Sequence, residues 1–199
     1  MLILITGANG FIGSHINSKL NKTKEFSTLS LTREDSRDSL QKKINKSDLI
    51  IHLAGVNRPT EVSEFDTINV GLTESICQFV QEKNTKTPII FGSSTQALLD
   101  NPYGQSKYSA ETLFKNLSSF HGSPVAILRL PGVFGQFCKP NYNSVIATFC
   151  YNIANNLPVI IDNPAKLLSV VYIDDVINQI INLILYKFNG CSYPIVKPE

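Results

Sequence analysis

The chain has 199 residues, of which 43% are hydrophobic, so it is long enough for one domain with a sizeable core. Its 18 basic and 16 acidic residues give a net charge of +2 at pH 7, and the short basic run from Lys42 to Lys46 is typical of a solvated helix face. This balance excludes binding to nucleic acid through a concentrated basic patch. Because no apolar run approaches the ~20 residues of a membrane span, we expect no membrane partner either.

The four cysteines and three histidines are scattered along the chain, in no metal-binding pattern. Scattered thiols are typical of a reducing compartment, so we expect a cytoplasmic protein with free cysteines and no metal site. The apolar run at residues 2–5 lacks the basic segment of a signal peptide and leads directly into a glycine loop. We therefore interpret this run as a strand.

Short apolar runs alternate with longer segments in which apolar residues recur at helical spacing. Such alternation is typical of βαβ units, whose right-handed crossovers build a doubly wound parallel sheet with helices on both faces. The sequence therefore predicts an α/β fold of the Rossmann type. In chain order the expected elements are strand 2–5, helix 12–20, strand 26–31, helix 40–44, strand 49–53, helix 65–80, strand 88–91, helix 103–120 and strand 125–130.

The pattern loosens towards the C-terminus of the sequence. We expect a helix at residues 145–149, short strands at 159–161 and 167–171, and a last helix at 173–185 that Asp174 would cap. We interpret residues 1–199 as a single domain. Its cofactor-binding core spans residues 1–135, and residues 136–199 form a small substrate lobe.

A glycine loop follows the first strand directly and opens the first helix. Gly7 permits a tight turn, Gly10 lets the backbone approach a pyrophosphate, and Gly13 lets helix and strand pack closely. The helix N-terminus then presents free N–H groups to the phosphates. The strand and helix on either side favour a dinucleotide site over a purely structural turn. The expected cofactor contacts in this loop are Gly7, Asn9, Gly10, Phe11, Ile12 and Gly13.

The residues after the second strand distinguish NAD from NADP. An acidic residue there binds the ribose 2′-hydroxyl of NAD, whereas an arginine favours the 2′-phosphate of NADP. Arg33 lies at this strand end and predicts NADP(H). The alternative is a solvated Arg33, with Glu34 or Asp35 on a ribose hydroxyl. Asp48, at the start of the third strand, is a candidate partner for the adenine or else a turn residue.

Tyr103 and Lys107 are one turn apart at the start of an expected helix, so they share a face. A phenol has a pKa of ~10, and a nearby ammonium group lowers that pKa by stabilising the phenolate. This pair predicts proton transfer beside a hydride transfer, although many helices contain such a pair by chance. Ser94 follows the fourth strand, at the edge where ligands bind, and is expected to hydrogen-bond the reacting oxygen.

The glycine loop and the Tyr103–Lys107 pair, with the segments at 48–55, 129–135 and 172–176, resemble the extended short-chain dehydrogenase/reductase family. This family contains sugar-nucleotide epimerases and dehydratases, and the likeness covers nearly the whole chain. It implies a homodimer that pairs the helices starting at Phe65 and Tyr103, and a supporting role for Asn69. The further cofactor contacts that it implies are Leu53, Ala54, Gly55, Lys107, Pro131 and Val133.

Three longer stretches, at residues 52–59, 96–104 and 139–150, look like the reductase domain of the CapF family of capsular polysaccharide enzymes. This likeness implies NADPH-dependent reduction of the C4 ketone of a UDP-linked 4-keto-6-deoxy-N-acetylhexosamine in capsule or O-antigen synthesis. That family carries a C-terminal cupin domain with a metal site; we expect no cupin domain in this sequence and an incomplete substrate lobe. The expected contacts to the UDP-sugar are Arg58, Gln96, Lys139, Asn141 and Asn143.

Some of these residues have simpler interpretations, and other functions stay open. Arg58 is equally well explained as a solvated loop residue, and residues 139–149 as a helix start with an apolar face. An NAD-dependent 4-epimerase or 4,6-dehydratase uses the same scaffold, and Asp100 is the only neighbouring acid for the dehydratase. A non-catalytic NADP-binding module is the third alternative. Consumption of NADPH in proportion to product separates a reductase from an epimerase.

Overall fold

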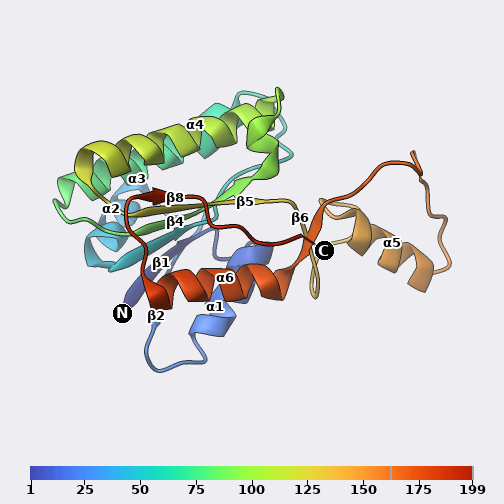
Figure 1. The fold of residues 1–199 in the computed structure, drawn as a ribbon, viewed down its shortest axis with the longest axis horizontal. Coiled ribbons are helices and arrows are strands. Elements are labelled where there is room, and N and C mark those ends of the chain that lie inside the picture. The colour runs from blue at the N-terminus through green and yellow to red at the C-terminus, as the bar shows by residue number, and fades with distance from the viewer. Residues whose placement is uncertain (162, 199) are drawn as a thin grey trace.

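Six parallel strands form one sheet in the computed structural model, which describes residues 1–161 and 163–198. The strands are β1 (Leu2–Thr6), β2 (Ser27–Leu31), β3 (Leu49–His52), β4 (Ile89–Ser94), β5 (Val125–Leu130) and β8 (Cys191–Ser192). Their order across the sheet is β2-β1-β3-β4-β5-β8, so the chain extends from β1 in both directions (Figure 1). This order confirms the predicted doubly wound α/β fold.

Helices cover both faces of this sheet, as Figure 1 shows. They are α1 (Phe11–Leu20), α2 (Arg37–Lys46), α3 (Gly71–Glu82), α4 (Pro102–Asn116) and α6 (Ile173–Tyr186). The helices α1 and α6 pack on one face around Ile16 and Ile180, whereas α2, α3 and α4 pack on the other around Ile44 and Phe114. The central strands are therefore buried on both sides, which explains why residues 2–5 form a continuous apolar run.

A side-chain cap sets the start of α4, the helix that carries Tyr103. Asn101 accepts a hydrogen bond from the Gly104 amide at 2.8 Å. Pro102 follows as the first helical residue, where the missing N–H of a proline costs no hydrogen bond. The sequence Asn-Pro-Tyr-Gly therefore fixes Tyr103 in the first turn of the helix.

Two helices keep their predicted extents but contain π-helical segments, and one predicted cap is wrong. The predicted helix 65–80 begins with a π-helical segment, η1 (Phe65–Val70), and α4 continues through a second one, η3 (Leu117–His121). The latter ends at Gly122, whose φ of 80° lies in the left-handed region that favours glycine. The expected cap of α6 by Asp174 is wrong, because Tyr172 is the N-cap and Asp174 lies in the first turn. A carboxylate there still interacts favourably with the helix dipole.

A small second region lies beside the main sheet. The strands β6 (Gly132–Phe134) and β7 (Val170–Tyr172) form a two-stranded parallel sheet, and α5 (Val145–Ala154) stands away from the main body in Figure 1. The predicted strand 159–161 is wrong, and the predicted strand 167–171 is replaced by β7. Ile160 and Leu167 are 76% and 96% exposed. Residues 159–161 are not in a strand, whereas Val170 and Val171 at the end of the second run pair with Gly132 and Val133 of β6.

After β7 the chain returns to the main sheet. The helix α6 packs against α1, and β8 pairs with β5 as the sixth strand. The expected division at residue 135 therefore does not hold for the segment from Ile173 onward, which belongs to the cofactor-binding core. With only two residues, β8 is too short to produce an apolar pattern in the sequence. In the part of the chain that the structure describes, no helix has the length and apolar character of a membrane span.

Candidate active site

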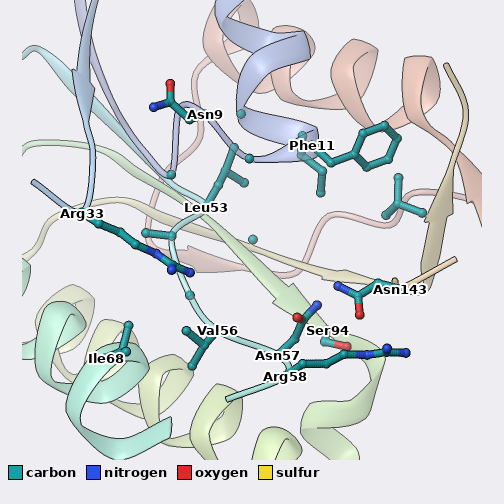
Figure 2. Close-up of a pocket in the computed structure, with 18 of the residues that line it drawn as sticks. Asn9, Phe11, Arg33, Leu53, Val56, Asn57, Arg58, Ile68, Ser94 and Asn143 are labelled. Carbon is teal, nitrogen blue, oxygen red and sulfur yellow. The ribbon is translucent and has the colours of Figure 1, made fainter. Parts of the chain in front are cut away.

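A cavity of about 1930 Å³ opens over the carboxyl ends of the strands. It extends from the glycine loop and the end of β2, across the segment after β3 and the end of β4, to residues 131–143 (Figure 2). The strand order reverses beside β1, and ligands of doubly wound sheets bind in the crevice at such a reversal. The cavity therefore lies where a dinucleotide and a second substrate are expected to meet.

The glycine loop is tightly folded, and its helix end is free. The Gly10 amide donates to the Gly7 carbonyl at 2.9 Å, and Gly7 has a φ of 69°. A Cβ on Gly13 would lie 2.1 Å from the Gly7 oxygen, so α1 packs directly on the loop. Gly10 is the N-cap of α1 and supplies no side-chain hydrogen bond, so the first amides of the helix face the cavity uncapped. This arrangement fits a pyrophosphate.

The segment after β3 is held against the glycine loop by Thr6. The hydroxyl of Thr6 accepts hydrogen bonds from the amides of Leu53 and Ala54 at 3.2 and 3.1 Å. It also lies 2.7 Å from Nδ1 of His52, whose pKa is lowered to about 3 by burial, with the Lys107 charge adding to the effect. A neutral His52 thus completes the support. His52 lies in the segment 48–55 that carries the family resemblance, but nothing in that segment predicts its contact with Thr6.

Asn69 connects the cofactor segment to α4. Its Oδ1 accepts from the Val56 amide at 2.8 Å, while its Nδ2 donates to the Val56 carbonyl and to the Ser106 hydroxyl, each at 3.0 Å. A Cβ on Gly55 would lie 2.9 Å from the same Oδ1. The side chain of Asn69 therefore places the segment 53–56 relative to the helix of Tyr103. The carboxamide satisfies both backbone groups of Val56, which a carboxylate would not do.

At the end of β2, Arg33 lines the cavity. Figure 2 shows the side chain of Arg33 extending into it. The carboxylate of Asp35, in contrast, is bound by the Lys43 ammonium, the Ser39 hydroxyl and the Thr32 amide, and these bonds hold its pKa well below the usual range. Asp35 is therefore engaged within its own loop and is a poor candidate for a ribose hydroxyl.

The structure changes the assignment of two further residues, Asp48 and Arg37. Asp48 accepts a hydrogen bond from the Leu2 amide at 2.7 Å, at the amino ends of β1 and β3 and thus at the opposite edge of the sheet from the cavity. Its proposed contact with adenine is wrong. Arg37, which was missed, lines the cavity and donates to Ser75 and Gln78 at 2.8 and 2.6 Å. Both partners are neutral, so the Arg37 charge is not balanced by them.

The three predicted catalytic residues come together at the end of β4. Tyr103, Lys107 and Ser94 all line the cavity, and Lys107 is buried with its Nζ donating to the Gly92 carbonyl at 3.0 Å. Burial lowers the pKa of Lys107 to about 8, and the charge of Glu111 opposes this shift. The Lys107 Nζ is 6.0 Å from the centre of the Tyr103 ring.

The electrostatic effect on Tyr103 differs from the prediction. Burial raises the pKa of Tyr103, and a hydrogen bond with the Ser94 hydroxyl partly opposes this increase. The four-residue spacing predicts instead that Lys107 lowers this pKa. In the structure the ammonium group is directed at the Gly92 carbonyl, while the phenol is enclosed beside the Phe65 ring. Tyr103 is therefore a neutral phenol at neutral pH.

The five predicted substrate residues line the far part of the cavity. Arg58 lies 5.7 Å above the Tyr142 ring, and the Tyr142 hydroxyl is 3.5 Å from Oδ1 of Asn57. The segment after β3 and the segment before α5 thus meet across the cavity, a contact that the sequence did not indicate. Figure 2 shows Asn57, Arg58 and Asn143 on this side, near Ser94. The complete predicted set is Arg58, Gln96, Lys139, Asn141 and Asn143.

Asp100, the extra acid considered for a dehydratase, is exposed and accepts a hydrogen bond from Gln105 at 2.6 Å. It is not among the residues that line the cavity. Within residues 1–161 and 163–198, no three histidine, cysteine or acidic side chains gather in a group that would hold a metal ion. The Tyr103 phenol, the Lys107 ammonium and the Ser94 hydroxyl are groups at this site that can donate or accept protons and hydrogen bonds.

Comparisons with known proteins match this description. The chain is 40% identical over its whole length to UDP-2-acetamido-2,6-beta-L-arabino-hexul-4-ose reductase of Pseudomonas aeruginosa, covering 54% of that protein. The crystal structure of the capsular polysaccharide assembling protein CapF from Staphylococcus aureus is 39% identical, with a TM-score of 0.85 over 98% of this chain and 53% of that one. The chain thus spans about half the length of these relatives.

A more distant structure shares the fold. UDP-glucuronic acid 4-epimerase from Bacillus cereus, solved with UDP-glucuronic acid and NAD, has a TM-score of 0.85 at 20% identity and covers 99% of this chain and 77% of that one. Residues 3–192 match the NAD dependent epimerase/dehydratase family. With this match over most of its length, the chain belongs to the NAD-dependent epimerase/dehydratase family.

Proposed function

We propose that this protein reduces the C4 ketone of a UDP-linked 4-keto-6-deoxy-N-acetylhexosamine with NADPH. The observation that carries the proposal is the meeting of Tyr103, Ser94 and Lys107 with an uncapped glycine loop in one cavity. The 40% identity to a named UDP-hexulose reductase supports the substrate class. Because that relative is about twice as long, the substrate and the activity are proposed for this chain and not taken over from it.

The roles of the residues follow from their positions. When bound, the nicotinamide cofactor supplies the hydride that reduces the ketone carbon. Tyr103 donates its hydroxyl proton to the developing alkoxide, and Ser94 hydrogen-bonds the same oxygen and orients it. Lys107 stabilises the phenolate left on Tyr103, because burial makes an unpaired anion costly there. Arg58 and Lys139, both exposed in the cavity, supply positive charge for the diphosphate of the substrate.

Tyr103 carries the proton that reduction requires. A reductase begins its cycle with a proton donor. Burial raises the pKa of Tyr103, so the phenol carries its proton at neutral pH. It then gives up that proton only when an alkoxide forms beside it, which is a much stronger base.

NADP(H) is the proposed cofactor, rather than NAD(H). Arg33 extends into the cavity at the end of β2, and Arg37 lines the same part with only neutral hydrogen-bond partners. Two guanidinium groups favour the 2′-phosphate of NADP. Asp35 is held by Lys43, so Glu34, which also lines the cavity, is the acidic candidate that a ribose 2′-hydroxyl of NAD would need.

Arg33→Ala is expected to weaken NADPH binding by about 10- to 100-fold, since a charge-assisted contact to phosphate is lost. NADH lacks the 2′-phosphate, so its affinity for the variant is expected to stay within about two-fold of its affinity for wild type. Titration of both cofactors by fluorescence measures the change. Lys42→Ala removes a positive charge from an exposed position on α2 and serves as the control. An unchanged NADPH/NADH preference in Arg33→Ala would overturn the assignment of the 2′-phosphate.

A direct assay tests the proposed reaction. The purified protein is incubated with NADPH and a UDP-4-keto-6-deoxy-N-acetylhexosamine, and the product is identified by mass spectrometry. We expect one NADPH oxidised for each sugar reduced, with a product 2 Da heavier. Conversion of a UDP-hexose without net use of NADPH would identify an epimerase, and cofactor binding without any turnover would identify a binding module.

A further inference from the structure

Glu111 is a buried acid that lies outside the cavity and has no part in the reaction described above. It belongs to α4 and is 0% exposed. Its carboxylate accepts hydrogen bonds from Ser93 at 2.6 Å and from Nε and Nη2 of Arg129 at 2.9 and 2.6 Å. The Tyr193 hydroxyl donates a further bond at 3.3 Å. One carboxylate thus joins α4 to β4, to β5 and to the segment after β8.

The position of Glu111 relates it to all three proposed catalytic residues. Tyr103, Lys107 and Glu111 follow one another at intervals of four residues, so they lie along one face of α4. Ser93 directly precedes Ser94 in β4 and pairs in register with Arg129 of β5. The Glu111–Ser93 bond therefore fixes the strand that carries Ser94 against the helix that carries Tyr103 and Lys107.

Glu111 also affects the charge of Lys107. The titratable groups near the Lys107 ammonium are Tyr103 and Glu111 on α4 and His52 on β3, and His52 is neutral with a pKa of about 3. Burial lowers the pKa of Lys107 to about 8, and Glu111 opposes that shift. Without Glu111, Lys107 is neutral in a larger fraction of molecules at the same pH. A neutral amine stabilises a phenolate less well than an ammonium group.

The groups around Glu111 determine the pKa of its carboxyl group. Burial raises the pKa of its carboxyl group, but hydrogen bonds from Arg129 and Ser93 outweigh that effect, so the net pKa is lowered. Lys115 on α4 contributes in the same direction, and the Tyr193 phenol and the Cys191 thiol face the same cluster. Glu111 is therefore an anion throughout the neutral range, and its influence on Lys107 does not vary there.

We propose that Glu111 is a positioning residue for the reductase reaction, which keeps Ser94 in place relative to Tyr103 and Lys107 through its hydrogen bonds with Ser93 and Arg129. This inference rests on the proposed function, because Ser94, Tyr103 and Lys107 have their roles from it. A purely structural ion pair would affect stability alone. A positioning residue affects the rate constant of the chemical step and its pH dependence while leaving cofactor binding in place.

Glu111→Gln is expected to change the pH profile of turnover. In wild type, we expect kcat for ketone reduction to fall at alkaline pH as Lys107, whose pKa burial lowers to about 8, loses its proton. In the variant this alkaline fall moves to lower pH, and kcat at pH 8 drops roughly 10-fold or more. Glu111→Asp keeps the charge and is expected to return the alkaline fall towards its wild-type position. An unchanged profile in a folded Glu111→Gln protein would refute the proposal.

Ser93→Ala tests the positioning separately and keeps the Glu111–Arg129 pair, so it remains informative if Glu111→Gln does not fold. We expect kcat to fall roughly 10-fold, since small displacements of reacting groups have large effects, with KM and NADPH affinity unchanged. Ser123→Ala is the matched control: Ser123 is equally buried, bonds only His121 among the side chains, and lies at the far end of the sheet. Wild-type kcat in Ser93→Ala would contradict the positioning role.

The two proposals fail in different ways. If wild-type protein reduces no UDP-4-keto sugar, the proposed function is refuted without any measurement on the variants. If wild-type protein is active and the Glu111 and Ser93 variants keep its kcat and pH profile, only the role of Glu111 is refuted.

Discussion

Tyr103→Phe is expected to lower kcat for ketone reduction by about 10²- to 10⁴-fold, because the general acid is lost while the ring remains. The Phe65 ring still packs beside residue 103, so the fold and the cavity are expected to persist. NADPH binding should change little, since the phosphate contacts lie on the glycine loop. The measurement is steady-state kinetics with a UDP-4-keto sugar, together with a titration of NADPH.

A second tyrosine on the same helix provides the control. Tyr108 is 50% exposed and its ring lies beside Lys115, away from the cavity. Tyr108→Phe also removes one tyrosine hydroxyl group from α4, and this variant is expected to keep the wild-type kcat. If Tyr103→Phe keeps most of the activity, the phenol is not the proton donor. Equal loss of activity and NADPH binding would instead show that Tyr103 serves to hold the cofactor.

Gly13→Ala has the second-largest expected effect. The added Cβ would lie 2.1 Å from the Gly7 carbonyl oxygen, which is backbone and has no room to move. The helix α1 must then shift away from the glycine loop, so we expect a loss of about 1–3 kcal/mol in stability from overpacking. NADPH affinity should fall by about 10²-fold or more, because the helix amides no longer face the pyrophosphate. Thermal unfolding with and without NADPH measures both effects.

Gly71→Ala is the matched control for this substitution. Gly71 is the first residue of α3, and the nearest atom to an added Cβ is 3.7 Å away. Alanine there is expected to leave NADPH binding unchanged and to stabilise the helix by about 0.5–1 kcal/mol. Similar melting temperatures and NADPH affinities for Gly13→Ala and wild type would show that the loop is more adaptable than its close packing implies.

Some parts of the site were predictable because local spacing determines them. A glycine triplet between a strand and a helix has few structural uses, and residues four apart on a helix share a face whatever the rest of the chain does. Gly7, Gly13, Tyr103 and Lys107 therefore lie where the sequence placed them. Ser94 is found at the carboxyl end of β4 for the same reason, since the parallel strands of a doubly wound sheet all end at one edge.

Other contacts depend on which segments the fold brings together. Asp48 looked suitable for adenine, but strand direction places it at the amino edge of the sheet. The pKa of Tyr103 depends on burial and on the direction of the Lys107 ammonium group, and neither is visible in a four-residue spacing. Arg37 and Glu111 form no motif, because their partners lie on other helices and strands.

The amino-acid sequence by itself determined the α/β class, the glycine loop and the tyrosine–lysine pair, because periodicity and short-range spacing specify local structure. Only the tertiary structure decided that α6 and β8 complete the core, that Glu111 joins α4 to two strands, and that Tyr103 stays protonated. These features depend on burial and on contacts between residues distant in the chain. Burial sets the cost of a charge, and no local pattern records it.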